Sequence, residues 1–473
     1  MPPTAMSHAA HAPPCVVPSA ARRASAGRAA PARVARASAR PATSSSSSGV
    51  ASTSSRVRDG AYKWRGHRVH FERGGCDPSV ATKHVVFLHG FGVGTFHYER
   101  QLRDLGALVD AETSDRDGHD SEDPTRARTT CVWALDFVGQ GASWPCDESD
   151  DAFPYVNEAD AAPEGFRYSV DTWVEQTTHF LETVVRPRDG GAYVAGNSLG
   201  GYVAALVAAT EISRVSKTTP KPTNRPKNQL VKGLILLNAT PFWAFVPADA
   251  RDARRRAAPW DGALPAPRWV RALFETYWNA FRSRRNVEGL LGLVYGDAGK
   301  VTETLVSAIL APTDRAPALA AFCSVVFSPK SALALDEATR AIRDAPGASK
   351  IPVALVYGRD DPWVVPLWGQ RMKRAIPRAA YYELPGVGHC PAHEAPERTN
   401  ACVADFVRRR EEEEIHHAKR SEADGAEAED DAGGSESATR ASAAAAEFLV
   451  DGAPRNVFER LAAWRETVGG VGA

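Results

Sequence analysis

Residues 192–209 read AYVAGNSLGGYVAALVAA. The first four form an apolar run typical of a buried strand, and the small apolar residues from Tyr202 onward are typical of a helix. Between them lies GNSLG at 196–200, the G-x-S-x-G pattern of a sharp strand-to-helix turn that lifts its serine out of a sheet. Glycines are needed there because side chains would collide across so tight a turn. The bare pattern also occurs by chance as a Gly-Ser loop, so its meaning depends on the rest of the chain.

Two aspartates downstream of Ser198 compete for the role of a catalytic acid. Residues 353–357, VALVY, form a short apolar run typical of a buried strand, and Gly-Arg-Asp-Asp-Pro follows as its turn. A carboxylate at the end of a strand is placed to orient an imidazole. We predict Asp361 as the acid, because enzymes with this arrangement usually carry it three residues after the glycine that ends the strand, here Gly358. Asp360 is then expected to be a solvent-facing turn residue.

The candidate base is His389, which lies in the glycine-rich loop LPGVGHCP after a short strand predicted at Ala380–Leu384. The order serine, aspartate, histidine is that of the α/β-hydrolase fold and differs from the orders of trypsin-like and subtilisin-like enzymes. His389 and His393 have the i, i+4 spacing of a metal pair, but Pro391 between them disfavours a helix. We therefore expect a Ser-His-Asp triad and no metal or other cofactor.

The loop HGFGVG at 89–94 directly follows an apolar strand predicted at His84–Leu88. Glycines in such a loop expose backbone N–H groups. In this fold the oxyanion hole combines the N–H of the residue after the nucleophile with one from the first strand-to-helix loop. The corresponding donors are the N–H groups of Leu199 and Phe91. A phosphate-binding loop is disfavoured, because no Lys-Ser or Lys-Thr follows and the G-x-G-x-x-G spacing is not met.

Apolar runs alternate with helical segments from about residue 60 to 410, which predicts a doubly wound, mostly parallel sheet. The expected strands are Arg68–Phe71, His84–Leu88, Val132–Phe137, Ala192–Gly196, Leu230–Asn238, Pro352–Tyr357 and Ala380–Leu384. Some 110 residues separate the fifth strand from the sixth, more than one connecting helix needs. We predict an inserted helical cap at 241–350, which divides the hydrolase core into 59–240 and 351–410.

The predicted cap is rich in aromatic residues. For any one of them, packing of the cap on the core explains the residue as well as ligand binding does. Together they favour a large apolar substrate. The candidate substrate-binding residues are Trp243, Trp260 and Trp278.

The first 58 residues contain eight arginines, no lysine and no acidic residue, and they are dense in Ala, Ser and Pro. This composition is typical of an organellar transit peptide. The remainder of the chain carries 49 basic and 57 acidic residues, so its charge gives no indication of nucleic-acid binding. No apolar run reaches the length of about 18 residues that indicates a membrane span.

Seven cysteines show no CxxC pattern and no regular spacing, which indicates reduced thiols in a compartment like the chloroplast stroma. Residues 411–447 are acidic and rich in Ala, Gly and Ser, and are predicted to be disordered. Residues 448–473 are expected to form a short helical tail.

Six stretches carry a closer resemblance than the fold alone. They are GFGVG with FHYE and QL at 90–102, DF with GQG at 136–141, GNSLGGYVA at 196–204, LNATPFW at 237–243, YGR with DPWV at 357–364, and GHCP at 388–391. Together they resemble the pheophytinases, plastid serine hydrolases of chlorophyll breakdown. The resemblance covers about residues 62–406, and NATPFW and DPWV are far more specific than the serine pentapeptide.

The resemblance implies Ser198 as nucleophile, Asp361 as acid and His389 as base, acting on the phytyl ester of pheophytin to give pheophorbide and phytol. It also implies a chloroplast location with peripheral thylakoid contact and a place in a pigment-degrading complex. The chain departs from the family in having His89 where a proline is usual and Ala392-His393 where His-Asp is usual. These changes leave the triad intact and bear on the shape of the entrance, and so on which pigment is preferred.

The nearest alternative is a chlorophyll dephytylase or another plastid lipid esterase with the same chemistry. Since fold does not fix function, an acyltransferase and a non-hydrolytic ligand receptor remain as alternatives from other classes. Dehalogenases and epoxide hydrolases use an aspartate nucleophile, which Ser198 argues against.

Overall fold

The computed structural model describes residues 56–111, 129–187, 190–218, 229–240, 259–331, 333–346 and 350–427. Trp243, nearly all of the predicted transit peptide and residues 428–473 lie outside the described residues. Contacts divide the chain into residues 1–52 and 53–473, and every described residue falls in the second unit.

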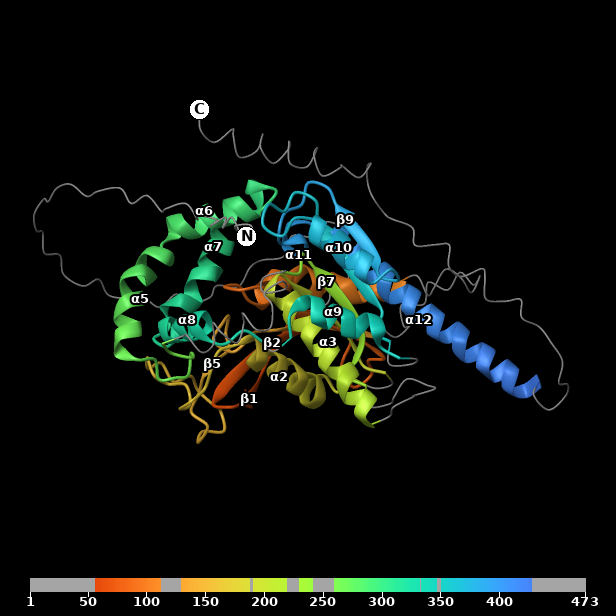
Figure 1. The fold of residues 1–473 in the computed structure, drawn as a ribbon, viewed down its shortest axis with the longest axis horizontal. Coiled ribbons are helices and arrows are strands. Elements are labelled where there is room, and N and C mark those ends of the chain that lie inside the picture. The colour runs from red at the N-terminus through yellow and green to blue at the C-terminus, as the bar shows by residue number, and fades with distance from the viewer. Residues whose placement is uncertain are drawn as a thin grey trace, which may run out of the picture. The chain divides into compact units, whose positions relative to one another are not determined.

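The core is a sheet with strand order β1-β2-β4-β3-β6-β7-β8-β9, and β5 pairs with β2 (Figure 1). The strands are β1 Arg58–Trp64, β2 His67–Gly75, β3 Lys83–Leu88, β4 Thr130–Leu135, β5 Trp144–Pro145, β6 Ala192–Asn197, β7 Val231–Leu237, β8 Val353–Gly358 and β9 Ala380–Leu384. Pairs from β4 to β9 along the sheet are parallel, whereas β2 pairs with β1, β4 and β5 antiparallel. Every residue of β4, β6, β7 and β8 is buried, as expected for strands covered on both faces.

Two layers of helices cover the sheet. Alternate residues of β3 show this, because Val86 and Leu88 belong to one buried apolar cluster and Val85 and Phe87 to the other. The first cluster takes in α2 Val170–Phe180, α3 Leu199–Thr218, α9 Leu335–Asp344 and α10 Leu367–Ala375. The second takes in η1 Thr95–Tyr98, η2 Gln101–Leu105, α1 Gly106–Ala111, α11 Pro391–Glu394 and α12 Pro396–Glu427. The predicted doubly wound α/β fold is confirmed.

A helical insertion stands between β7 and β8, at one end of the sheet in Figure 1. It contains α5 Arg268–Phe281, α6 Arg284–Val294, η4 Ala298–Lys300, α7 Glu303–Leu310, η5 Ala311–Asp314 and α8 Ala318–Phe327. The predicted cap boundary at residue 350 is too far along the chain, because α9 packs against α3 and covers the sheet. We use the name cap for α5 to α8.

Helix α12 corrects the prediction that disorder begins at residue 411. The helix continues to Glu427, and its first acidic turns dock on the core. Lys232 Nζ lies 2.7 Å from Glu411 Oε1 and 3.0 Å from Glu414 Oε2, and the Tyr193 hydroxyl donates to Glu411 at 2.7 Å. Glu411 and Glu414 would repel each other in an isolated segment, whereas here both pair with Lys232. At the other end, β1 begins at Arg58, so the predicted transit segment overlaps the fold by one residue.

Within the described ranges, no single helix has the length and hydropathy to cross a bilayer. Residues 303–314 and 318–327 meet those criteria only as a pair, with a bend of 90° between them.

Candidate active site

Ser198 occupies the turn between β6 and α3 with φ at +54°. A non-glycine residue in this region is strained by of order 1–3 kcal/mol, so the surrounding structure must hold it there. The Ser198 N–H donates to the Leu237 carbonyl, and the Ser198 carbonyl accepts the N–H of Thr240, both at 3.0 Å. A Cβ on Gly196 or on Gly200 would lie 2.2 Å from a backbone oxygen. Both glycines of the pentapeptide are therefore required for the turn.

His389 and Asp361 form a buried pair. The His389 Nδ1–H donates to Asp361 Oδ2 at 2.7 Å. The same carboxylate accepts from Asn238 Nδ2 at 2.6 Å and from the N–H groups of Trp363 and Val364 at 2.8 and 2.9 Å. Four donors fix the carboxylate, and the His389 ring is held with Nε2 free to serve a second partner.

Asp360 has a different environment and different contacts from Asp361. It is exposed, and its Oδ2 accepts the N–H of Gly386 at 2.9 Å. The structure thus brings Asp361, and not Asp360, to the imidazole of His389.

Asn197, the residue before the serine, connects the elbow to the histidine loop. Its Nδ2 donates to the carbonyl of His389 at 2.9 Å and to that of Leu237 at 3.0 Å. In the described part of the chain no hydrogen bond joins Ser198 Oγ to His389. Such contacts are often long without substrate and tighten when it binds.

The loop after β3 lies against the serine, since a Cβ on Gly90 would be 3.3 Å from Ser198 Cβ. His89 fixes this loop: its Nδ1–H donates to the Gly90 carbonyl at 2.7 Å, and its Nε2 accepts the Phe137 N–H at 3.0 Å. Burial lowers the pKa of His89, which keeps the ring neutral and able to accept. Because C=O and N–H point in opposite directions across a trans peptide, fixing the Gly90 carbonyl also fixes the N–H of Phe91.

The second candidate donor, Leu199, is the first residue of α3. N–H groups in the first turn have no partner within the helix, and the helix dipole favours negative charge beside them.

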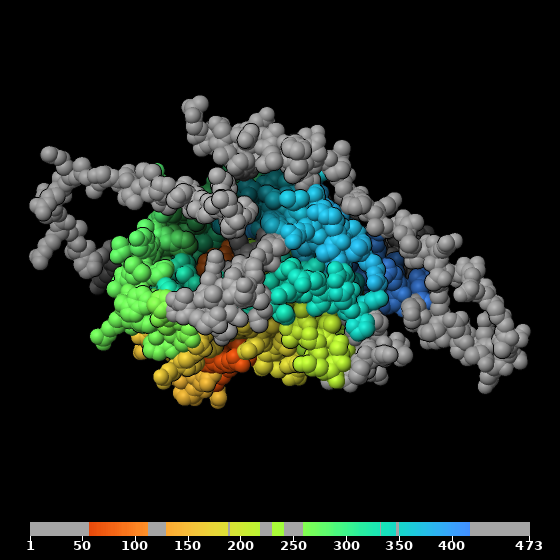
Figure 2. Space-filling view, viewed as in Figure 1, coloured from red at the N-terminus to blue at the C-terminus, as the bar shows by residue number. Residues whose placement is uncertain are grey.

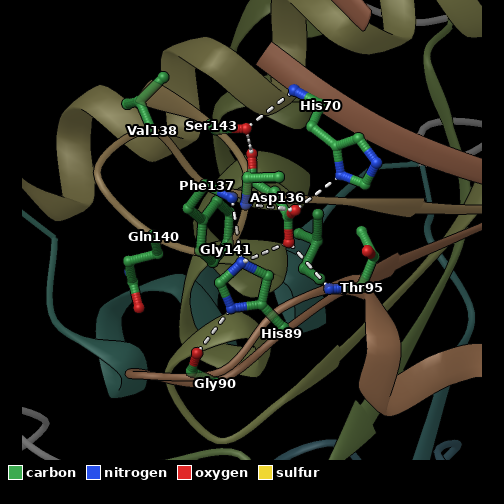
Figure 3. Close-up of polar contacts among 12 residues, drawn as sticks. His70, His89, Gly90, Thr95, Asp136, Phe137, Val138, Gln140, Gly141 and Ser143 are labelled. Atoms are coloured by element: carbon green, nitrogen blue, oxygen red, sulfur yellow. Dashed lines mark hydrogen bonds and ion pairs between the residues drawn. The ribbon is translucent and has the colours of Figure 1, made fainter. Parts of the chain in front are cut away.

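A buried carboxylate, Asp136, anchors the end of the glycine loop at 89–94 to the sheet (Figure 3). Its Oδ1 accepts the N–H of Thr95 at 2.8 Å, and its Oδ2 accepts from Ala142 N at 2.9 Å and from His70 Nδ1 at 2.7 Å. The other ring nitrogen of His70 contacts Asp59. Burial would raise the pKa of Asp136, but these bonds and the positive charge of His70 lower it. The loop that carries Phe91 therefore depends on an ion pair about which the sequence pattern gave no signal.

The pKa of His70 predicts a pH-dependent stability. Burial alone would lower this pKa, but Asp136 and Asp59 raise it from 6.5 to about 9. Because the folded-state pKa is raised, the stabilisation is complete below the unfolded pKa and is lost as the pH rises through about 9. The free energy of unfolding should fall by at most about 3 kcal/mol across this window, and by less to the extent that water screens the exposed Asp59.

Urea unfolding of the wild-type chain between about pH 6 and about pH 10 measures this loss. The control is His70→Gln, which lacks the titrating group. The stability difference between the two proteins should shrink as the pH rises, and a difference that stays constant across the window would contradict the assignment.

Glu394 is a positioning residue that the sequence analysis missed. Its buried carboxylate accepts the N–H groups of Gly388 and Cys390, both at 2.9 Å, and that of Gly296 at 2.8 Å. The first two residues flank His389, and Gly296 follows α6. Glu394 thereby joins the cap to the histidine loop.

His393, which has metal-like spacing from His389, has other neighbours. Its ring stacks on that of His97 with centroids 5.0 Å apart, and its Nδ1 lies 3.2 Å from the Tyr295 hydroxyl. Burial lowers the pKa of both histidines. Pro391 begins the short helix α11, which contains His393 but not His389, so the two histidines do not share a helix, as the position of the proline predicted. In the described ranges no three His, Cys, Asp or Glu side chains are arranged to hold a metal ion.

The cap contacts the glycine loop at 89–94 through Phe322 on α8. Its ring centroid lies 6.2 Å from that of Phe91, 5.2 Å from that of Trp278 and 5.2 Å from that of Phe281. Trp260 lies further along the same cluster, with its ring against Phe327 at 5.4 Å and its Nε1–H donating to a carbonyl. Of the two predicted tryptophans among the described residues, Trp278 contacts Phe322, the ring that contacts Phe91, whereas Trp260 contacts Phe327.

The chain belongs to the α/β hydrolase family, whose model matches residues 85–401. It is similar to pheophytinase, chloroplastic, of Arabidopsis thaliana, with 34% identity over 355 residues that cover 72% of this chain and 64% of that one. The resemblance predicted from the motifs is confirmed. The chain spans less than two thirds of the length of this curated relative.

Solved structures similar to the chain include a haloalkane dehalogenase from Bradyrhizobium elkani, with 18% identity, 75% of this chain and 99% of that chain covered, and a TM-score of 0.47. An epoxide hydrolase from Acinetobacter nosocomialis has 16% identity, covers 76% and 90%, and also has a TM-score of 0.47.

Proposed function

We propose that the chain is a plastid serine esterase that cleaves the phytyl ester of pheophytin, giving pheophorbide and phytol. The observation that carries the proposal is the buried pair of His389 and Asp361 beside an elbow serine held at positive φ. The substrate and the plastid location are taken from the chloroplast pheophytinase to which the chain is similar. The arginine-rich, acid-free first 58 residues also favour import into a plastid.

In the proposed first half-reaction, Ser198 Oγ attacks the ester carbonyl while its proton passes to His389 Nε2. Asp361 accepts from Nδ1–H, which sets the tautomer of the imidazole and stabilises the imidazolium. The negative oxygen of the tetrahedral intermediate is bound by the N–H groups of Phe91 and Leu199. The bond to the phytyl oxygen then breaks, and His389 gives the proton to the leaving phytol.

In the second half-reaction, His389 takes a proton from water, and the hydroxide adds to the acyl carbon on Ser198. The C–Oγ bond breaks, the proton returns to Ser198, and the chlorin acid leaves. Neither half-reaction requires a metal or another cofactor.

The aromatic cluster around Phe322 is the proposed site for the phytyl chain. A buried methylene contributes about 0.8 kcal/mol, so a phytyl chain offers on the order of 10 kcal/mol before the costs of binding. Pheophytin and chlorophyll share this chain and its ester. An apolar wall discriminates between them through the macrocycle, because a bound Mg²⁺ and its axial ligand demand polar partners that such a wall does not provide.

The direct test is to incubate the purified chain with pheophytin and with chlorophyll and to separate the products by chromatography. We expect pheophorbide and phytol, with kcat/KM for pheophytin about tenfold or more above that for chlorophyll, a ratio that corresponds to about 1.4 kcal/mol. Comparable values for the two pigments would make the chain a general dephytylase.

The alternatives from other classes give different outcomes in the same assay. Ester formed from an added alcohol would indicate an acyltransferase. Pigment binding without turnover, unchanged in Ser198→Ala, would indicate a ligand receptor.

A further inference from the structure

Helix α5 carries apolar side chains that the described part of the chain leaves uncovered. Trp269, Leu273 and Tyr277 recur every four residues and are 50%, 52% and 67% exposed. We call these three residues the cap stripe. Residues four apart lie on one face of a helix, so the three side chains form a continuous line. Figure 2 shows the cap, in green, on the outside of the molecule.

The inner face of the same helix is already occupied. Phe274 packs on Phe322 and Phe327 of α8, Trp278 packs on Phe322, and Val270 is buried. The apolar arc of α5 is therefore wider than the surface that α8 covers. Most helices of globular proteins carry polar side chains on the face that is exposed to water. A contiguous exposed apolar patch on that face marks an interaction site.

The segment that carries the cap stripe has an excess of basic residues, whereas residues 59–473 have an excess of acidic ones. From Arg268 to Val294 the sequence carries five arginines and two glutamates, whereas from residue 59 onward the chain carries 49 basic and 57 acidic residues. Arg268 and Arg285 are exposed and have no carboxylate within ion-pair distance in the described ranges. The stripe is thus an apolar line with unneutralised cations near both ends of α5.

We propose that the cap stripe docks on a lipid bilayer that carries anionic headgroups. Trp and Tyr favour the boundary between headgroups and acyl chains, and arginines beside them bind the anionic groups. This rests on the proposed function, because a phytyl ester partitions into a bilayer. Phe281, at the end of α5, contacts Phe322, which contacts Phe91, so a series of ring contacts connects the helix that carries the stripe with the loop that carries Phe91.

A second copy of the chain is a poorer occupant of this surface. If two copies paired through α5 in antiparallel fashion, Arg268 of each copy would approach Arg285 of the other. The like charges would repel, whereas an anionic surface neutralises them.

The test is co-sedimentation of the full chain with pigment-free vesicles, made of phosphatidylcholine alone or with added phosphatidylglycerol. We expect binding that phosphatidylglycerol strengthens. The double variant Trp269→Ser/Tyr277→Ser should lose about tenfold or more in partitioning to both vesicles. Arg268→Gln/Arg285→Gln should lose about tenfold on the anionic vesicles alone. Ile415→Ser, which changes an equally exposed apolar residue on α12, is the matched control and should bind as wild type.

Hydrolysis of a short water-soluble ester should be unchanged in all these variants, because none of the changed residues lies in the candidate active site. Wild-type binding by the Trp269→Ser/Tyr277→Ser variant, or no binding by the wild-type chain, would overturn the proposal. A wild-type dimer that this variant converts to a monomer, seen by light scattering, would assign the stripe to a second copy instead. Vesicle binding without pheophytin turnover would defeat the proposed function and leave the docking surface standing.

Discussion

Ser198→Ala is expected to lower turnover of a phytyl ester by about 10⁴-fold to 10⁶-fold, the range seen when a nucleophile that acts as a unit with its base is removed. This substitution is expected to leave the fold intact. Alanine has the same Cβ as serine at φ +54°, and the backbone bonds of Ser198 to Leu237 and Thr240 do not use the hydroxyl. The loss should appear in kcat, because the hydroxyl makes its new bond only during the reaction.

His389→Ala should cause a similar loss, and the double variant with Ser198→Ala should lose little more than either single variant. The readout is kcat/KM for pheophytin and for a short soluble ester, with the urea midpoint as a check on folding. Ser213→Ala on α3 is the matched control, since it removes a hydroxyl whose one hydrogen bond among the described residues is to the Ala209 carbonyl. Losses that add independently would show that the two residues do not act together.

The parallel strands could be predicted from the sequence because each is a continuous apolar run. The strand predicted at Ala380–Leu384 has the observed bounds of β9, and the others shift by a few residues at their ends. The strands β1 and β5 were missed. β1 is a partly exposed edge strand with the mixed sequence RDGAYKW, and β5 is two residues long, so neither has a run that stands out.

Some residues of the candidate site could likewise be predicted from the sequence, and others could not. Ser198, Asp361 and His389 lie in short motifs, so the sequence alone was enough to propose them as a triad. The residues that hold them in place act across long separations: Asn238 donates to Asp361 from 123 positions away, and Glu394 accepts from Gly296 across 98. Such contacts leave no local pattern, because their partners are brought together only by the sheet and the cap.

Phe322 shows how far the substrate-binding residues could be predicted from the sequence. The aromatic richness of the cap predicted an apolar site, but the residue that contacts Phe91 lies on α8 in the stretch ALAAFCSVVF, which reads as an ordinary buried helix. Composition indicates that aromatic contacts exist, whereas the packing of α5 on α8 decides which ring faces the loop.

Asp361→Asn is expected to lower kcat by about 10⁴-fold, because an asparagine no longer holds the histidine in the tautomer that accepts the serine proton. The four partners of Asp361 are all donors: His389 Nδ1–H, Asn238 Nδ2 and the N–H groups of Trp363 and Val364. The NH₂ group of an asparagine would face one of these four donors. The imidazole of His389 would then have to turn or lose its hydrogen bond to residue 361.

Asp360→Asn is the matched control, one residue away in the same turn. Its side chain accepts the N–H of Gly386, which an amide oxygen also accepts, and its backbone N–H donates to the Val387 carbonyl in either variant, so kcat and KM should stay near wild type. In Asp361→Asn, KM should change little while kcat falls, since the carboxylate acts on the imidazole and makes no contact with substrate. If Asp360→Asn were the more damaging change, the acid would have to be assigned to Asp360, and the buried pair seen here would have a structural role only.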